Sequence, residues 1–336
     1  MKKIVGVLIT ILFVLVGNNI AYAARDNEFR IISSENEHRE KDVEDIKRLI
    51  QMSYSGEWDN VKIYDHLSYY DNAIDEVIYV YPIYKEAICV LLAYSDGKGS
   101  VTLTEDTKIY DEIVSAKNTG LYGSNIYNSE LNIYEDNKII KLYGEDVGKN
   151  KIIADVDLSK VDNYKSVVSS VGKNQWGSTV ATKKCNITNF VKQGNNGLCW
   201  ASAVATIANY KRGLSLSATM VADKMNIGYN QGATLEQTRS ALSLYGLSYT
   251  SLNNKMSWSR VVTNIKIDKP FIIAMTSNVG GHIITGYGYV SDLSDKNAIN
   301  RAVLAWDSNG NKITFPYSAP YIVISGVMFT WANSLY

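Results

Sequence analysis

Gln-Gly-Asn-Asn-Gly-Leu-Cys-Trp-Ala-Ser-Ala, residues 193–203, is the stretch from which most of the fold and chemistry of this chain can be predicted. A glycine-containing turn runs into small apolar residues, a pattern that predicts a helix starting at Cys199. A helix N-terminus stabilises a thiolate, and its backbone N–H groups can stabilise a developing oxyanion. Gln193 precedes the cysteine by six positions, so its carboxamide can turn back as a second oxyanion donor. The stretch therefore predicts a cysteine nucleophile, with a buried, unreactive cysteine as the alternative.

A thiol nucleophile needs an imidazole that holds it as a thiolate and later protonates the leaving group. The second half of the chain contains a single histidine, His282, which follows two glycines and begins an apolar run ending in Gly-Tyr-Gly. Taken alone, it could equally be a hydrogen-bonded core residue. Beside the cysteine segment, we interpret it as the catalytic imidazole.

A catalytic imidazole also needs a group that orients its second nitrogen. The run Ala-Trp-Asp-Ser-Asn-Gly, residues 305–310, offers Asp307 first and Asn309 second. We prefer Asp307, because it follows a predicted strand and a carboxylate stabilises an imidazolium more strongly than an amide does. Two alternatives stay open. Asp307 could cap the turn at Asn309-Gly310, or it could alternate with Asn309 and Asn311 in a calcium loop, although the distal glutamate of an EF-hand is missing.

Gln193, Cys199, Trp200, His282 and Asp307 match, in order and type, the active-site segments of papain-like cysteine proteases. The chain resembles that family from about residue 184 to the C-terminus. The resemblance implies an α+β, papain-like two-lobed catalytic domain, with the cysteine on a helical lobe and the histidine on a sheet lobe. It also implies a protein or peptide substrate in the cleft between the lobes, and we expect no cofactor and no metal.

The chain departs from the plant and lysosomal members of that family. Asn196 stands where those enzymes have a structural cysteine, the spacing from the cysteine to the histidine is shorter, and the leading half is β-rich. These features make it more similar to compact bacterial members, the staphopain-like and C39-like secreted peptidases. The resemblance further implies that the first half is a propeptide that keeps a zymogen silent.

The first residues of the 336-residue chain are typical of an export signal. Two lysines precede an apolar run over residues 4–16, and Ala21-Tyr22-Ala23 fits a cleavage site. We expect a signal peptide over residues 1–23 of a bacterial protein that is secreted or extracellular, or held at the cell surface; an uncleaved anchor is the alternative. A formal net charge of zero argues against a nucleic-acid partner. The odd number of cysteines, three, leaves at least one thiol free.

Two domains are predicted after the signal: a β-rich propeptide or accessory domain over residues 24–178, and the peptidase domain over residues 179–336. In the first, the predicted elements are a helix over 35–52, strands over 76–84 and 87–94, and a hairpin over 131–143. The polar stretch 159–184 is predicted to be a linker, with cleavage within about 169–184. The first half is then expected to cover the cleft and to inhibit the enzyme.

The second domain combines helical and strand patterns. The predicted elements are a helix over 200–210, a helix that opens with a Thr234–Gln237 capping box and runs to about 245, and strands over 271–276, 282–290, 301–306, 312–315 and 321–331. Helices followed by antiparallel strands are an α+β order.

The leading hypothesis is a secreted cysteine endopeptidase made as a zymogen. A cell-wall amidase or a transpeptidase-like Cys-His acyltransferase is the alternative within enzymes. The alternative outside enzymes is a catalytically silent papain-like shell, in which the Tyr-rich first half is a binding or adhesion module.

Overall fold

The computed structural model describes residues 36–54, 58, 60–64, 66–71, 76–107, 121–125, 130–135, 138–143, 167–170, 180–194, 196–277, 280–292, 299–324 and 327–336. The predicted signal peptide, residues 1–23, lies outside this part. Within it, no helix has the length and apolar character needed to cross a membrane.

The described elements form a β-rich first half and a second half that contains both helices and strands. In chain order they are α2 (Asn36–Ser53), β1 (Lys62–Tyr64), β2 (Leu67–Asp71), β3 (Glu76–Lys85), β4 (Ile88–Ser95), β5 (Val101–Thr104), β6 (Leu121–Asn125), β7 (Glu130–Glu135), β8 (Lys138–Tyr143), β9 (Val167–Ser170), β10 (Val180–Lys184), α4 (Cys199–Arg212), α5 (Ala218–Met225), α6 (Leu235–Leu244), β11 (Ser251–Leu252), α7 (Trp258–Lys266), β12 (Phe271–Ser277), β13 (Gly280–Asp292), β14 (Arg301–Asp307), β15 (Asn311–Pro316), β16 (Ile322–Ile324) and β17 (Val327–Leu335).

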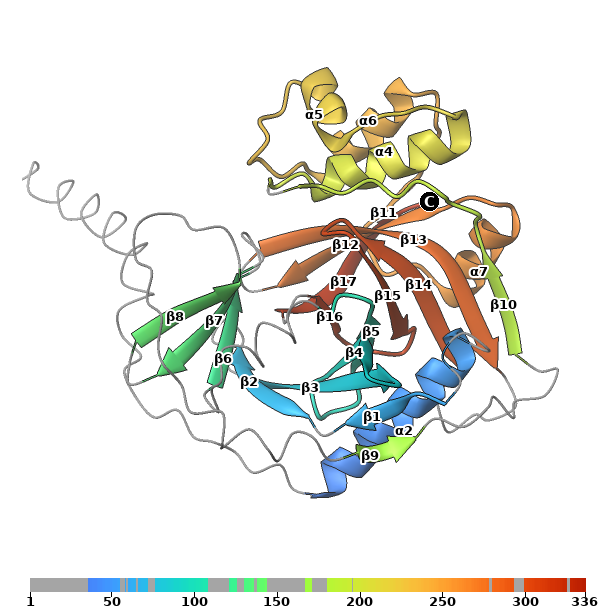
Figure 1. The fold of residues 1–336 in the computed structure, drawn as a ribbon. Helices are drawn as coiled ribbons and strands as arrows, with labels where there is room; N and C mark the ends of the chain where they lie inside the picture. The colour runs from blue at the N-terminus through green and yellow to red at the C-terminus, as the bar shows by residue number, and fades with distance from the viewer. Residues whose placement is uncertain are drawn as a thin grey trace, which may run out of the picture.

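One large antiparallel sheet joins both halves of the chain (Figure 1). Its main path runs β11-β17-β12-β13-β14-β15-β5-β4-β3-β1-β9, while β10 pairs with β13, β16 with β17 and β2 with β3. The strands β6, β7 and β8 form a separate three-stranded sheet. The joint between the halves is the pairing of β15 with β5, so hydrogen bonding continues across the predicted domain boundary at residue 178.

The helices α4, α5 and α6 form a layer on one side of this sheet (Figure 1). Their apolar residues make a core of their own, in which Trp200, Val204 and Ile207 of α4 are fully buried. Ile272 of β12 and Ile283 of β13 close that core from the sheet side. A helical layer over a large antiparallel sheet confirms the predicted α+β class.

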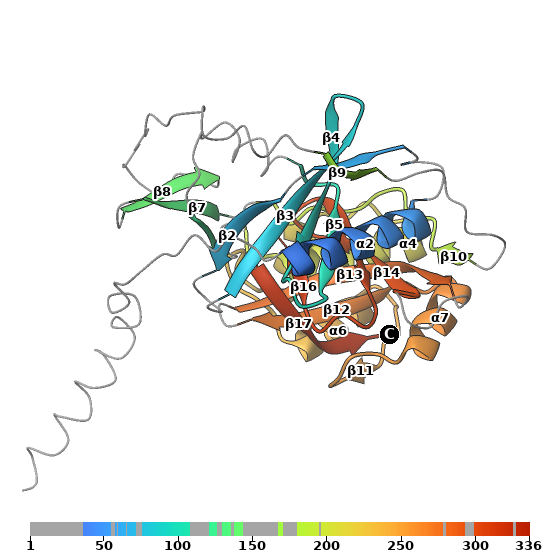
Figure 2. The same ribbon diagram turned by 90° about the horizontal axis from the view of Figure 1, so that it is seen from below.

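A second core lies on the other side, where α2 runs along the sheet (Figure 2). Ile46, Leu49 and Ile50 of α2 belong to the same buried cluster as Val290 and Phe315 of the peptidase strands. The two halves therefore share apolar packing as well as a sheet.

A buried ion pair also ties α2 to the second half. Arg48 lies 3.4 Å from Asp292, at the end of β13, and the two side chains are 6% and 0% exposed. The guanidinium also donates from Nε to the carbonyl of Ile299. Because an unpaired buried charge costs about 3–5 kcal/mol, removal of either partner is strongly unfavourable.

Most strongly patterned elements lie where the sequence predicted them. The helix over 35–52, the strands of the first half and its hairpin correspond to α2, β3, β4, β7 and β8. The Thr234–Gln237 capping box is present at the start of α6.

Three predictions need correction. The predicted linker over 159–184 contains two strands, β9 and β10. The side chains of β10 are mostly exposed, so the strand lacks the apolar alternation that would have revealed it. The single strand predicted over 321–331 is a hairpin of β16 and β17. The short helices α5 and α7 were missed, although Ser217 caps α5 by accepting the Met220 N–H.

The Gly-Tyr-Gly sequence of β13 has a packing reason. A Cβ on Gly286 would lie 2.3 Å from the ring of Phe271, its partner on β12. A Cβ on Gly288 would lie 2.9 Å from Leu304 and 3.0 Å from the Lys183 carbonyl on β10. The register shifts between the two glycines, and beyond this irregularity β10 rather than β12 pairs with β13.

Candidate active site

Cys199 is the first residue of α4. Its side chain is partly exposed, while the next residue, Trp200, is fully buried and donates its indole N–H to the Gln231 carbonyl at 3.2 Å. The first turn of α4 contains no acidic residue, so the positive end of the helix dipole is not offset there. The helix ends at Gly213, which adopts the left-handed conformation (φ 64°). A rigid, buried helix therefore presents the thiol at its N-terminus.

His282 and Asp307 meet across the neighbouring strands β13 and β14. His282 Nε2 lies 2.7 Å from Asp307 Oδ1, and the residues are only 5% and 1% exposed. Asp307 Oδ1 also accepts the Asn309 N–H at 3.2 Å. The same carboxylate thus caps the turn and contacts the imidazole, so the two interpretations of Asp307 are compatible. Asn309, the other candidate for the orienting group, contributes its backbone N–H to this contact with Asp307.

The surroundings of His282 favour its charged form. Burial alone lowers the pKa of the imidazole, but hydrogen bonds to Asp307 and to Cys199, together with their charges, raise the pKa to about 10. Of the two residues, Asp307 raises the pKa of the imidazole more than Cys199 does. An imidazolium held between a carboxylate and a thiol is the arrangement that stabilises a thiolate.

Gln193 is fixed to the turn that follows Asp307. Its backbone N–H donates to the Ser308 carbonyl at 2.8 Å, and its Oε1 accepts from the Ser308 hydroxyl at 2.7 Å. The carbonyl oxygen of the carboxamide is occupied in this way, which leaves the NH₂ group as the part that can donate to an oxyanion. The structure thus joins the predicted oxyanion residue to the hairpin that carries Asp307.

The segment before Gln193 links the helical layer to the sheet. The Val191 carbonyl accepts from the Ser202 hydroxyl of α4 at 2.6 Å and from the Trp306 indole of β14 at 2.9 Å. Phe190 stacks on the Trp306 ring, with centroids 4.6 Å apart. These contacts set the distance between the layer that carries the cysteine and the strands that carry the histidine and aspartate.

Sequence reasoning missed two residues of this site. The only sequence feature that could have indicated Ser308 is its position directly after Asp307. Its hydrogen bond to Gln193 could not be predicted, because the two residues are more than 100 positions apart. Phe329 of β17 lies with its ring 5.7 Å from the His282 ring and has no signal in the sequence, because β17 follows β14 only after two further strands.

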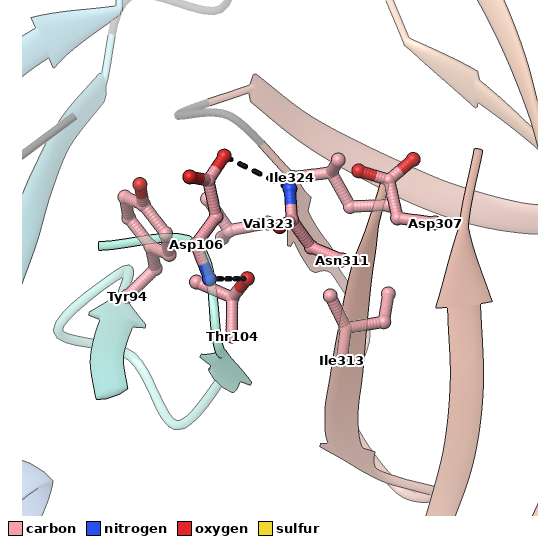
Figure 3. Close-up of a pocket in the computed structure, with 8 residues that line it drawn as sticks. All are labelled: Tyr94, Thr104, Asp106, Asp307, Asn311, Ile313, Val323 and Ile324. Atoms are coloured by element: carbon pink, nitrogen blue, oxygen red, sulfur yellow. Dashed lines mark hydrogen bonds between the residues drawn. The ribbon is translucent and has the colours of Figure 1, made fainter. Parts of the chain in front are cut away.

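Asp307 and Asn311 also line a small pocket at the joint between the halves (Figure 3). Asn311 Nδ2 donates to Asp106 Oδ2 at 2.9 Å, so the Asn311 side chain directs its NH₂ group toward a carboxylate. That orientation and the His282 contact of Asp307 disfavour the calcium-loop alternative, which needs oxygen ligands. In the described residues, no three His, Cys, Asp or Glu side chains gather as metal ligands would.

Comparison with known proteins gives the class. The comparison supports the cysteine-type peptidase of the papain-like class that the resemblance implied for the second half of this chain. Specifically, residues 182–304 match the family model described as papain-like cysteine protease AvrRpt2. The match includes Gln193, Cys199 and His282, ends before Asp307, and covers less than half of the chain. No curated protein matches the chain. The narrower likeness to staphopain-like and C39-like enzymes stays a prediction.

Proposed function

We propose that this protein is a secreted cysteine endopeptidase that uses Cys199 as nucleophile, His282 as acid and base, Asp307 as the orienting carboxylate and Gln193 as an oxyanion donor. The observation that carries the proposal is the 2.7 Å contact of the buried His282 imidazole with Asp307, beside which Cys199 also raises the pKa of that imidazole. Protein or peptide substrates follow from the peptidase class.

The proposed steps follow from the positions of these groups. The Cys199 thiolate attacks the carbonyl carbon of the peptide bond, and the negative charge that develops on its oxygen is stabilised by the Cys199 N–H and the Gln193 NH₂ group. The His282 imidazolium then gives its proton to the amine as it leaves. Water, deprotonated by the neutral imidazole, attacks the thioester and regenerates the thiol and the acid product. Asp307 holds the ring throughout and stabilises its charge.

One experiment separates this proposal from its alternatives. The purified protein, after cleavage before Val180, is incubated with an epoxysuccinyl inhibitor of thiol proteases, its mass is measured, and its action on a denatured protein is followed. A single adduct on Cys199 together with peptide cleavage supports the endopeptidase. An adduct without any cleavage indicates an amidase or acyltransferase, and absence of an adduct indicates a catalytically silent module.

Export and latency belong to the same proposal. Residues 1–23 are proposed to direct secretion, and an exported protein that begins at residue 24 by mass would support this. The first half is proposed to act as an inhibitor of the uncut chain. The described part of that half packs on the sheet side, against β13, β14, β15 and β16. Because β10 is paired with β13, cleavage is expected before Val180 rather than anywhere up to residue 184. Equal activity of uncut and cut chains would contradict latency.

Asp307→Ala is expected to move the upper pH limit of activity to lower pH. The ion pair of thiolate and imidazolium exists below the pKa of His282 and is lost as the pH rises through it. Asp307 and Cys199 together raise the pKa of His282 to about 10 against the effect of burial, so removal of Asp307 lowers the pKa and the ion pair is lost at lower pH. We also expect kcat/KM at neutral pH to fall by about 10- to 100-fold, because the ring loses its orienting partner. A pH profile of kcat/KM measures both effects.

Asp307→Asn is the matched variant, since it keeps an acceptor for the ring but removes the charge. It should show the same shift of the upper limit with better retained activity. An unchanged upper limit in both variants would show that the carboxylate does not set the protonation of His282.

A further inference from the structure

The joint between the two halves lies beside the candidate active site. Leu103 and Thr104 of β5 pair with Thr314 and Ile313 of β15, and the Glu105 N–H continues the ladder by donating to the Lys312 carbonyl at 3.2 Å. The strand β15 begins immediately after the hairpin that carries Asp307. Strand β5 of the first half therefore pairs with β15 on the edge that β14 does not occupy, next to that hairpin.

The last described contacts of this segment reach the hairpin itself. Asp106 Oδ2 accepts from Asn311 Nδ2 at 2.9 Å, and the Asp106 N–H donates to Thr104 Oγ1 at 3.1 Å (Figure 3). Asn311 is the partner of Asp307 in the register of β14 and β15, and the Gly310 N–H closes the turn on the Asp307 carbonyl at 2.9 Å. The Asp106 carboxylate of the first half therefore binds Asn311, the residue that lies opposite Asp307 on the neighbouring strand.

The remaining contacts between the halves are those of a permanent interface. The apolar residues of α2 share a core with β13 and β15, and the Arg48–Asp292 ion pair is almost fully buried. The Val323 N–H of β16 donates to Thr102 Oγ1 of β5 at 3.0 Å in a buried position. Departure of the first half would expose the edge of β15 and leave Asp292 without its arginine.

The candidate triad is assembled while the first half is docked in this way. His282 contacts Asp307 at 2.7 Å, and Cys199 at the start of α4 raises the pKa of the same imidazole. Docking at β15 is therefore compatible with a formed site, and the inhibition proposed above for the uncut chain would act on substrate access rather than on the triad.

We propose that the first half remains bound after cleavage, as a non-covalent part of the active enzyme, and that Asp106 is a positioning residue that holds the Asp307 hairpin through Asn311. The inference rests on the proposed function, because it describes the processed peptidase. Cutting the chain between β9, which pairs with β1, and β10, which pairs with β13, separates the halves in sequence but breaks none of the strand pairs that join them.

The first test asks whether the halves stay together. In the full chain with Cys199→Ala, a recognition sequence for a site-specific protease is placed between β9 and β10, so that cutting does not depend on the chain's own activity. After cutting, both fragments are expected to elute together at the position of the uncut chain in size-exclusion chromatography, and to separate only in denaturant. Elution of either fragment alone under native conditions overturns the proposal.

The second test asks whether Asp106 acts on catalysis. In the otherwise unaltered full chain, after processing, Asp106→Ala is expected to lower kcat by about tenfold with little change in KM, because a small displacement of an orienting group costs rate rather than binding. Asp106→Asn keeps an oxygen that can accept from Asn311 and should restore most of kcat. Wild-type kcat in the alanine variant, or equal losses in both variants, overturns the positioning role.

Glu105→Gln is the matched control. Glu105 lies in the same segment and faces Lys312 at 3.7 Å, but both side chains are partly exposed, so the pair contributes little. Its kcat is expected to stay within about twofold of wild type. If the wild-type chain cleaves no peptide at all, the proposed function fails, while the elution test still decides whether the halves remain bound.

Discussion

Cys199→Ala is expected to abolish peptide cleavage, with a loss in kcat of about 10⁴-fold or more, while the protein stays folded. The thiol is the only group at the start of α4 that can form the covalent intermediate, and members of such a triad act as one unit. The side chain is partly exposed, so its truncation removes little packing. Progress curves on a denatured protein substrate, with thermal unfolding of both proteins, measure the two parts of the expectation.

Cys185→Ala is the control for this variant. Cys185 is buried, and burial together with Asp268 raises the pKa of its thiol to about 12, so it stays protonated and unreactive at neutral pH. We expect it to keep cleavage activity and to be labelled by the epoxysuccinyl inhibitor as wild type is. Cleavage near the wild-type rate by Cys199→Ala would place the nucleophile elsewhere.

His282→Ala is expected to lower kcat by about 10³- to 10⁵-fold, second only to loss of the cysteine. The imidazole contacts Asp307, and Cys199 is among the groups that raise its pKa. Without the imidazole, the thiol loses the cation that stabilises its charged form and the leaving amine loses its proton donor. The rate at which a thiol reagent alkylates Cys199 at neutral pH should fall as well, which separates loss of the thiolate from loss of substrate binding.

His66→Gln provides the comparison for the histidine. His66 lies in the first half, where its ring packs on Tyr79 and Tyr81 at about 5 Å between centroids. It has no part in the candidate site, so we expect kcat and the alkylation rate near those of wild type. Retained cleavage by His282→Ala would exclude this residue as the acid and base.

Local patterns in the sequence were enough to predict the pieces of the site. The turn of small and polar residues before Cys199 and the apolar run after it indicated the start of α4, and the Thr234–Gln237 pair indicated the start of α6. Such signals depend on backbone groups within one helical turn, so they can be recognised without knowledge of the fold. The catalytic roles of Cys199, His282, Asp307 and Gln193 stay predictions until the variants are measured.

By itself, the sequence determined the peptidase class, the α+β order and the short list of candidate residues, because residue chemistry, spacing and periodicity are local properties. Only the tertiary structure decided that Asp307, rather than Asn309, lies against His282, that Ser308 holds Gln193, and that Asp106 reaches Asn311. It also decided that the halves share one sheet and one core. Each of these contacts joins strands or turns far apart in the chain, and strand pairing is selected by the burial of whole faces, which no single segment encodes.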